Sequence, residues 1–121
     1  MKRLIKWLVI LLLAAVAGIF AWGYAPDTDA AQMESKYSSA TSRFAELEPG
    51  LRVHYRDEGK ADGRVLVLIH GSNASLHTWE PWVKILGKDY RVISLDLPGH
   101  GLTGKNPAGV YDNSSYVSVV D

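Results

Sequence analysis

Cysteine is absent from the 121 residues of the chain. Its absence excludes a disulfide framework, a thiolate metal site and a cysteine nucleophile, and it leaves the redox compartment undetermined. An excess of basic charge is also missing, because Lys and Arg number 13, Asp and Glu number 13, and the formal net charge is zero. Since a basic face is what nucleic acid recognises first, we expect no nucleic-acid partner.

Charged residues are also missing from residues 7–26. About 20 helical residues, at roughly 1.5 Å of rise each, reach about 30 Å, which is the thickness of the hydrocarbon core of a bilayer. Basic residues precede this run and acidic residues follow it, so the positive-inside rule predicts a cytoplasmic N-terminus and an extracytoplasmic domain, periplasmic or outer. We therefore expect residues 1–26 to be a single-pass signal-anchor that contacts the membrane through residues 7–26. The flanking charges are Lys2, Arg3 and Lys6 before the run, and Asp27, Asp29 and Glu34 after it.

Two alternatives to the anchor stay open. A cleaved signal peptide shares the charged start and the apolar centre, and cleavage would make the protein secreted, but small residues suited to cleavage are poorly placed around residues 22–26. The second alternative is a buried helix of a soluble protein, although such a helix would usually show a polar stripe, which residues 7–26 lack. Residues 27–42 are polar and small without clear periodicity, which predicts a solvated tether to a globular part over residues 43–121.

The first half of the globular part predicts a hairpin. Residues 42–47 and 51–56 alternate weakly between apolar and polar side chains, and the turn signal Glu48-Pro49-Gly50 lies between them. We expect two half-exposed antiparallel strands. Residues 57–63 carry two glycines and no apolar run, so they are predicted to be a loop.

The second half predicts a strand, a helix and a strand. The run Val65–Ile69 has no polar residue, which is typical of a strand covered on both faces. Thr78 is predicted to cap a helix that Gly87 ends, and residues 90–95 predict the next strand. The order predicts a right-handed crossover between parallel strands. A last helix is expected after residue 113, with Ser114 or Ser115 as its cap.

Special loops follow both of the predicted parallel strands. The first reads His70-Gly71-Ser72-Asn73, and the second reads Asp96-Leu97-Pro98-Gly99-His100-Gly101. Ligands of open α/β sheets bind beyond the carboxyl ends of the strands, so both loops should border one crevice. Gly71 lets the backbone turn sharply, and an amide in such a turn, here that of Ser72, can stabilise an oxyanion that develops on a carbonyl.

The apolar strand that ends in His70-Gly71, followed by a Trp-containing helix, a strand and the DLPGHG turn, resembles the α/β-hydrolase superfamily. The resemblance covers roughly residues 43–121. It implies an α/β fold, here the N-terminal part of an incomplete α/β-hydrolase fold behind a transmembrane helix. It further implies that the Ser72 amide supplies half of the oxyanion hole and that the reaction uses water and no cofactor. We expect Gly71 and Asn73 to bind substrate, with the alternative that Asn73 only shapes the loop.

The chain departs from the superfamily pattern in one decisive respect. It contains no G-x-S-x-G, G-x-D-x-G or G-x-C-x-G elbow, so we expect the nucleophile, the acid and the base beyond residue 121 and this fragment alone to be inactive. No His and Asp spacing matches a metal site. The other loop residues are predicted to be structural, and His54 and His77 to lie at the surface or at an edge. The structural set is His70, Asp96, Pro98, Gly99, His100 and Gly101.

The leading hypothesis is therefore a membrane-anchored hydrolase of carboxylic esters or related acyl compounds, with a small-molecule substrate. Dehalogenase, epoxide hydrolase and carbon–carbon bond hydrolase stay open, because these activities differ in the nucleophile and in the cap domain. The rival from another class is a non-catalytic, membrane-tethered binding protein or an inactive truncated product. Because the resemblance pairs the third strand with a fifth that is missing here, we also expect an exposed edge and poor stability.

Overall fold

A four-stranded sheet in the order β1-β2-β4-β3 organises the globular part. The structure is a computed structural model, and it describes residues 1–48 and 50–120. β1 and β2 pair antiparallel, which confirms the predicted hairpin, while β3 and β4 pair parallel as expected. Pro49 of the predicted turn lies outside the described residues. The strands are β1 (Ser42–Glu48), β2 (Leu51–Gly59), β3 (Arg64–Ile69) and β4 (Tyr90–Leu95).

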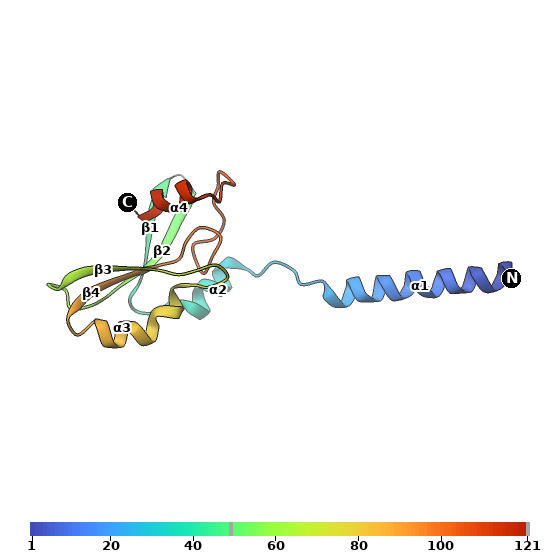
Figure 1. Cartoon of the computed structure of the whole chain (residues 1–121), viewed down its shortest axis with the longest axis horizontal. Coiled ribbons are helices and arrows are strands. Elements are labelled where there is room, and N and C mark those ends of the chain that lie inside the picture. The colour runs from blue at the N-terminus through green and yellow to red at the C-terminus, as the bar shows by residue number, and fades with distance from the viewer. Residues whose placement is uncertain (49, 121) are drawn as a thin grey trace.

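Helices lie on both faces of this sheet and at one of its ends. Figure 1 shows α3 and α4 on opposite sides of the strands, and α2 at the end of the globular part from which an extended linker leads to α1. A short 3₁₀ helix, η1, immediately precedes α3. The bounds are α1 (Lys2–Gly23), α2 (Ala30–Tyr37), η1 (Leu76–Trp79), α3 (Glu80–Leu86) and α4 (Asn113–Val120).

β2 is longer than its sequence pattern predicts, because it pairs along its first part with β1 and along its last part with β4. Asp57 lies opposite Ile93 and Gly59 lies opposite Arg91, so the predicted loop 57–63 is wrong for its first three residues. The strand ends where only glycine fits. A Cβ at Gly59, whose φ is +86°, would stand 2.5 Å from the Tyr90 carbonyl oxygen.

The two faces of the sheet are covered unequally. On the η1 and α3 side, Val92 and Leu76 are almost completely buried, at 0% and 1% exposure. On the α4 side, Leu51, Val53 and Leu95 form a small core against which Val119 and Val120 pack. β3 lies at the sheet edge, as predicted, but it is not covered on both faces. Its α4-side residues are exposed, with Val65 at 56%, Val67 at 47% and Ile69 at 43%.

The predicted helix between β3 and β4 exists, but it begins differently. Thr78 does not cap it: α3 begins at Glu80 after the 3₁₀ turn, and Pro81 occupies its first turn without losing a needed donor. Gly87 ends the helix as predicted. Trp79 is half-buried while Trp82 is 56% exposed, so this short helix covers the sheet with only part of its apolar surface.

α2 occupies most of the stretch predicted to be a solvated tether. The Asp29 side chain caps it by accepting from the Gln32 amide, and Glu34 forms a two-point ion pair with Arg52 of β2, at 2.6 and 3.1 Å. The expectation of a fully solvated backbone is therefore wrong for residues 30–37. Periodicity could not reveal this helix, because it has only two turns and is stabilised by contacts with β2.

α4 is capped by Asp112 rather than by the predicted Ser114 or Ser115. One Asp112 carboxylate oxygen accepts from the Ser115 amide at 2.8 Å and from the Ser114 hydroxyl at 2.7 Å. The hydrogen bond from the Ser115 amide is the first of the contacts that hold the pKa of Asp112 below its usual value. An acidic cap at a helix N-terminus also fits the direction of the helix dipole.

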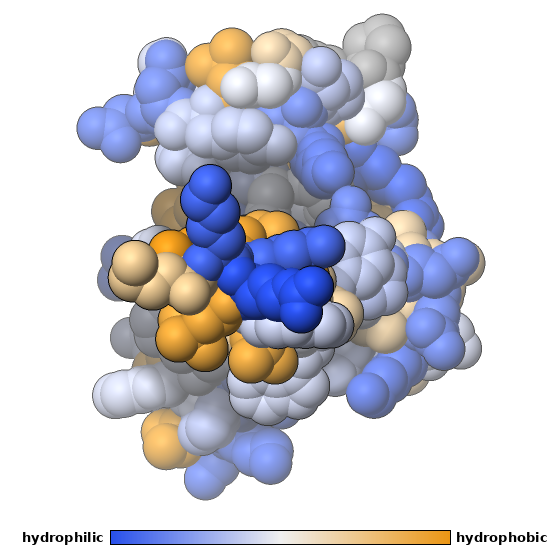
Figure 2. All heavy atoms as spheres, turned by 90° about the vertical axis from the view of Figure 1, so that its right-hand side faces the viewer, coloured by the Kyte–Doolittle hydropathy of each residue, from blue (hydrophilic) through white to orange (hydrophobic). Residues whose placement is uncertain are grey.

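α1 is long and apolar enough to cross a membrane, although a signal sequence near an N-terminus has the same properties. None of its residues is buried against the rest of the chain. Figure 2 looks along this helix from its N-terminal end, where hydrophilic atoms form the tip and hydrophobic side chains surround the axis behind it. The expected sequence of a charged start and an uncharged helix is therefore present as one continuous element.

The exposed edge of β3 predicts self-association. We expect purified residues 27–121 to associate through β3, because an unpaired apolar strand is a template for pairing with another strand. Val67→Lys should raise the protein concentration at which half is associated by about tenfold, measured by light scattering. Val110→Lys is the matched control, because Val110 is similarly exposed, at 44%, but lies in a loop. Monomeric wild-type protein with cooperative unfolding would contradict this prediction.

Candidate active site

The two special loops meet beyond the carboxyl ends of β3 and β4. The Leu97 amide donates to Nε2 of His70 at 3.1 Å, and His70 Nδ1 donates to the Gly71 carbonyl at 2.7 Å. The rings of His70 and His100 lie side by side, with their centroids 5.0 Å apart. His100 in turn donates to the Pro98 carbonyl at 3.1 Å. The expected common crevice therefore has both loops at its border, held together by histidines.

Ser72 lies exposed in the turn after β3. Among residues 1–48 and 50–120, none accepts a hydrogen bond from its amide, so this donor is available to a bound group. The predicted role of Gly71 in the sharp turn is wrong, because its φ is not in the left-handed region and a Cβ there would meet open space. Asn73 makes the turn instead, with a φ of 55° that asparagine tolerates better than most residues. The open space beside Gly71 leaves room for a substrate.

Asp96, fully buried at the end of β4, accepts hydrogen bonds from three directions. Its Oδ1 accepts from the Leu76 amide at 2.8 Å, and its Oδ2 accepts from the Leu102 amide at 3.0 Å and from His54 Nδ1 at 2.8 Å. Burial alone would raise the pKa of Asp96, but the hydrogen bonds from His54, Leu76 and Leu102 outweigh it and lower the pKa below its usual value. The carboxylate therefore stays ionised and joins β2, η1 and the turn after β4.

Two glycines of the DLPGHG turn are required by this arrangement. A Cβ at Gly101, whose φ is +48°, would stand 2.1 Å from Oδ2 of Asp96. Gly99 has a φ of +80°, and a Cβ there would lie 3.1 Å from the Tyr111 ring. Only glycine combines the left-handed backbone with this close approach. The sequence position of both glycines is thus explained by the carboxylate and the ring that they approach.

His54 is the site residue that the sequence pattern missed. The prediction of a surface or edge position is wrong, because His54 is 0% exposed and its Nε2 lies 2.9 Å from the hydroxyl of Ser42 in β1. Alternation along β2 implied one exposed face, yet β2 is an interior strand, and its second face is covered by η1, α3 and α2. Arg56, on that same face, is also buried, at 5%. The signal in the sequence was chemical. His54 and Arg56 lie inside a predicted strand, and Asp96 follows later in the chain as a possible partner.

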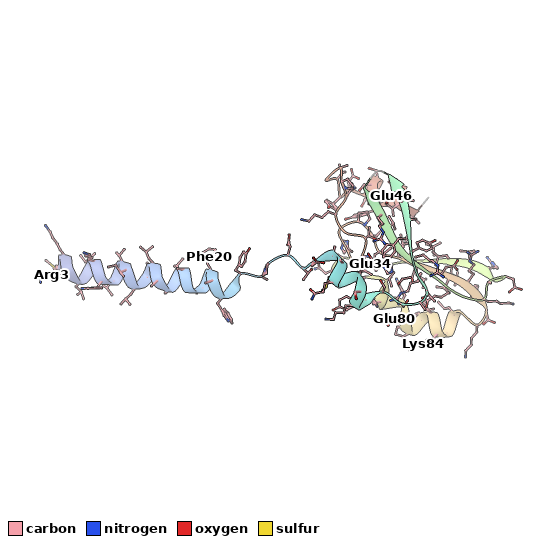
Figure 3. The ribbon with its side chains drawn as sticks, turned by 180° about the vertical axis from the view of Figure 1, so that it is seen from behind. Arg3, Phe20, Glu34, Glu46, Glu80 and Lys84 are labelled. Atoms are coloured by element: carbon pink, nitrogen blue, oxygen red, sulfur yellow. The ribbon has the colours of Figure 1, made fainter. Side chains whose placement is uncertain are left out.

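A second polar cluster joins α2 to the start of α3. Arg56 donates to Glu80 at 2.8 Å and to the Tyr37 carbonyl at 3.3 Å, and His77 donates to the same Glu80 oxygen at 2.7 Å. Hydrogen bonds from Arg56, and then from His77, lower the pKa of Glu80. His77 is half-exposed, close to its predicted position. Figure 3 shows Glu34 and Glu80 at the end of the globular part that faces the linker.

A cavity of about 270 Å³ lies between α2 and the two loops. α2 and the linker supply an apolar wall, while the opposite wall comes from the start of η1 and from the turn that holds Asp96. Among the described residues, no cluster of three His, Asp or Glu side chains suits a metal ion. The lining residues are Thr28, Met33, Tyr37, Ser75, His77, Asp96, Gly101 and Leu102.

The curated relatives include several hydrolases, together with a decarboxylase and an acetyltransferase component. The (E)-2-((N-methylformamido)methylene)succinate hydrolase of Acinetobacter baylyi is 42% identical over 60 residues, which is 50% of this chain and 22% of that protein. The chain thus spans about a fifth of the length of this relative.

Solved structures of similar proteins include enzymes with different substrates. The Cif epoxide hydrolase from Acinetobacter nosocomialis has a TM-score of 0.62 at 32% identity, over 80% of this chain and 34% of that one. A membrane phospholipase A has a TM-score of 0.61 at 28% identity, over 99% of this chain and 39% of that one. Residues 64–121 also match the family model described as the alpha/beta hydrolase fold. With its parallel β3–β4 pair and the loops at their carboxyl ends, the chain belongs to the α/β-hydrolase superfamily.

Proposed function

We propose that this chain is the N-terminal part of a membrane-anchored hydrolase of carboxylic esters or related acyl compounds. The observation that carries the chemistry is the exposed Ser72 amide, which has no acceptor among the described residues and lies where a carbonyl oxygen could bind. Ester hydrolysis develops negative charge on that oxygen, and a fixed amide donor stabilises it more in the transition state than in the ground state. Gly71 and Asn73 flank the amide and contact the substrate.

The remaining chemistry belongs to residues outside this chain. We propose that a nucleophile, an acid and a histidine base lie beyond residue 121, and that the amide after the nucleophile completes the oxyanion hole. The nucleophile attacks the ester carbonyl to give an acyl-enzyme and releases the alcohol. Water, deprotonated by the base, then releases the carboxylic acid. His70, His100 and Asp96 hold the loops and take no part in proton transfer.

The membrane assignment is supported by the length and apolar character of α1 and by one similar structure. The match to a membrane phospholipase A extends over 99% of the chain and so includes α1. α1 is also followed by only six residues before α2, which reach roughly 20 Å at most when extended. The cavity lined by α2 and the loops would therefore lie close to the bilayer surface, on the extracytoplasmic side. An ester substrate that partitions into the membrane would have a short path to it.

An epoxide hydrolase is the second candidate, because the Cif epoxide hydrolase from Acinetobacter nosocomialis matches 80% of this chain. The two activities differ in the nucleophile, which this chain does not contain. A purified intact protein that releases acid from p-nitrophenyl esters and leaves styrene oxide unchanged would decide for the ester hydrolase. Hydrolysis of neither compound would favour the non-catalytic, membrane-tethered binding protein.

Removal of the Ser72 amide tests the oxyanion role. In the intact protein, Ser72→Pro should lower kcat for a p-nitrophenyl ester by about 10² to 10³ with little change in KM, because one transition-state donor is lost. Ser72→Ala keeps the N–H group and should retain most of kcat. Thermal unfolding monitors the fold of each variant. Unchanged turnover in a folded Ser72→Pro variant would refute the assignment.

The absence of cysteine permits a clean test of topology. Ser35→Cys on the exposed side of α2 should react with a membrane-impermeant maleimide in intact cells, because the domain is extracytoplasmic. Leu4→Cys at the start of α1 should react only after the cells are lysed. The cysteine-free parent measures the background. Recovery of the labelled Ser35→Cys protein as a soluble product without its first residues would show a cleaved signal peptide instead of an anchor.

A further inference from the structure

A serine, a histidine and an aspartate form a chain of hydrogen bonds that is buried at His54 and Asp96 and half-buried at Ser42. Ser42 Oγ lies 2.9 Å from His54 Nε2, and His54 Nδ1 lies 2.8 Å from Asp96 Oδ2. Neither His54 nor Asp96 has any exposed surface. The order of the three groups is that of a hydrolytic triad. The burial of these groups and their hydrogen-bond partners distinguish a catalytic role from a structural one.

The direction of the hydrogen bond between His54 and Asp96 follows from the ionised carboxylate of Asp96. Because the hydrogen bonds on Asp96 keep it ionised, its carboxylate can only accept, and His54 Nδ1 must carry the donated proton. Nε2 on the other side of the ring lies 2.9 Å from the Ser42 hydroxyl. Ser42 Oγ accepts in turn from the Ser39 amide at 3.0 Å. Every polar atom of the chain of bonds has its partner within the fold.

This closed network does not suit a nucleophile. A proton passed to His54 could not reach a leaving group, since the ring has no exposed surface and both its nitrogens are engaged. The Ser42 oxygen also already accepts a backbone amide.

The network instead reaches the loop that carries Ser72. Asp96 Oδ1 accepts from the Leu76 amide at the far end of that loop, and the Leu97 amide donates to His70 at its near end. The loop 71–75 is thus held between anchors on two consecutive residues, 96 and 97. A hydrogen-bond donor of an oxyanion hole must lie within a few tenths of an ångström of its ideal position. Any shift of Asp96 moves the end of the loop that positions Ser72.

We propose that Ser42, His54 and Asp96 are positioning residues that fix the Ser72 amide for the transition state. Ser42 in the N-terminal hairpin orients His54, His54 orients Asp96, and Asp96 fixes the loop through Leu76. The inference rests on the proposed function only where it concerns the reaction rate. The coupling between Ser42 and the loop is a property of the fold and is measurable without a substrate.

The ionised state of Asp96 predicts a pH-dependent contribution to stability. Asp96→Asn places an N–H group against one of three donors, and should lower the melting temperature by roughly 10 °C at pH 7. Because the folded pKa of Asp96 is lower than its unfolded value of about 3.9, its contribution is complete above that value and is lost as the pH falls through the folded pKa. The difference in melting temperature between wild type and Asp96→Asn should therefore become smaller below about pH 4.

Circular dichroism melting from pH 2.5 to 7 measures this difference, with Asp62→Asn, in the exposed turn before β3, as the matched control. The titratable side chains that face Asp96 are His54, which contacts it, and His77 and Tyr37, which line the same cavity. A constant difference across the whole pH range would contradict an ionised Asp96.

The positioning role is tested at Ser42 in the intact protein. Ser42→Ala should lower kcat for a p-nitrophenyl ester roughly ten- to hundredfold without a matching change in KM. A displaced Ser72 amide would stabilise the transition state less well, while binding of the substrate would change little. Ser42→Thr keeps the hydroxyl and should restore kcat. Ser118→Ala, which removes a hydrogen-bonded serine hydroxyl from exposed α4, is the control. A fall in kcat that tracks the loss of melting temperature, without rescue by threonine, would overturn the proposal.

Amide hydrogen exchange separates this inference from the proposed function. In Ser42→Ala, exchange at Leu76 should become faster than in wild type, whether or not the protein hydrolyses esters. Faster exchange at Leu76, without any ester hydrolysis by the wild type, would support the coupling between Ser42 and the loop and would refute the proposed function. Unchanged exchange and unchanged kcat in Ser42→Ala would overturn the positioning role. Labelling of Ser42 by a fluorophosphonate would also overturn it, because it would make Ser42 a nucleophile.

Discussion

A single buried carboxylate holds this structure together at the point where its chemistry would occur. Asp96 accepts hydrogen bonds from a histidine ring nitrogen of β2, from an amide at the start of η1 and from an amide in the turn after β4. An ionised carboxylate without solvent is stable only when its acceptor sites are filled, so each of these three elements is fixed by the same group. The glycine at position 101 follows from it, because any side chain there would occupy the place of the carboxylate oxygens.

The sequence predicts the parts of the fold that depend on local pattern. The apolar run of β3, the strand β4, the hairpin and the helix α1 are recognisable because each has its own periodicity or length. Interior positions of β2 could not be recognised in this way. Whether His54 and Arg56 face water depends on α2, η1 and α3, which lie elsewhere in the sequence, and alternation within one strand carries no information about them.

The same distinction applies to the candidate site. The loops after β3 and β4 could be located from Gly, Pro and Asp residues at strand ends, but the conformation of the first loop could not. The turn depends on the positive φ of Asn73 rather than on Gly71, and the partner of Asp96 is a histidine 42 positions earlier in the chain. Contacts that join distant segments are set by packing of the whole sheet, so they appear only in three dimensions.

α2 gives a fixed structure to part of the segment that joins α1 to the sheet. A fully solvated tether would make no fixed contact with the domain, whereas α2 is fixed to β2 through Glu34 and Arg52 and to the start of α3 through the Tyr37 carbonyl and Arg56. Exposed ion pairs contribute little singly, but Arg56 is buried and would lose its partners if α2 moved away. The helix also supplies one wall of the cavity beside Asp96. The segment between α1 and the sheet is therefore partly a folded part of the domain, and the contacts that hold α2 also fix the wall that α2 gives to the cavity.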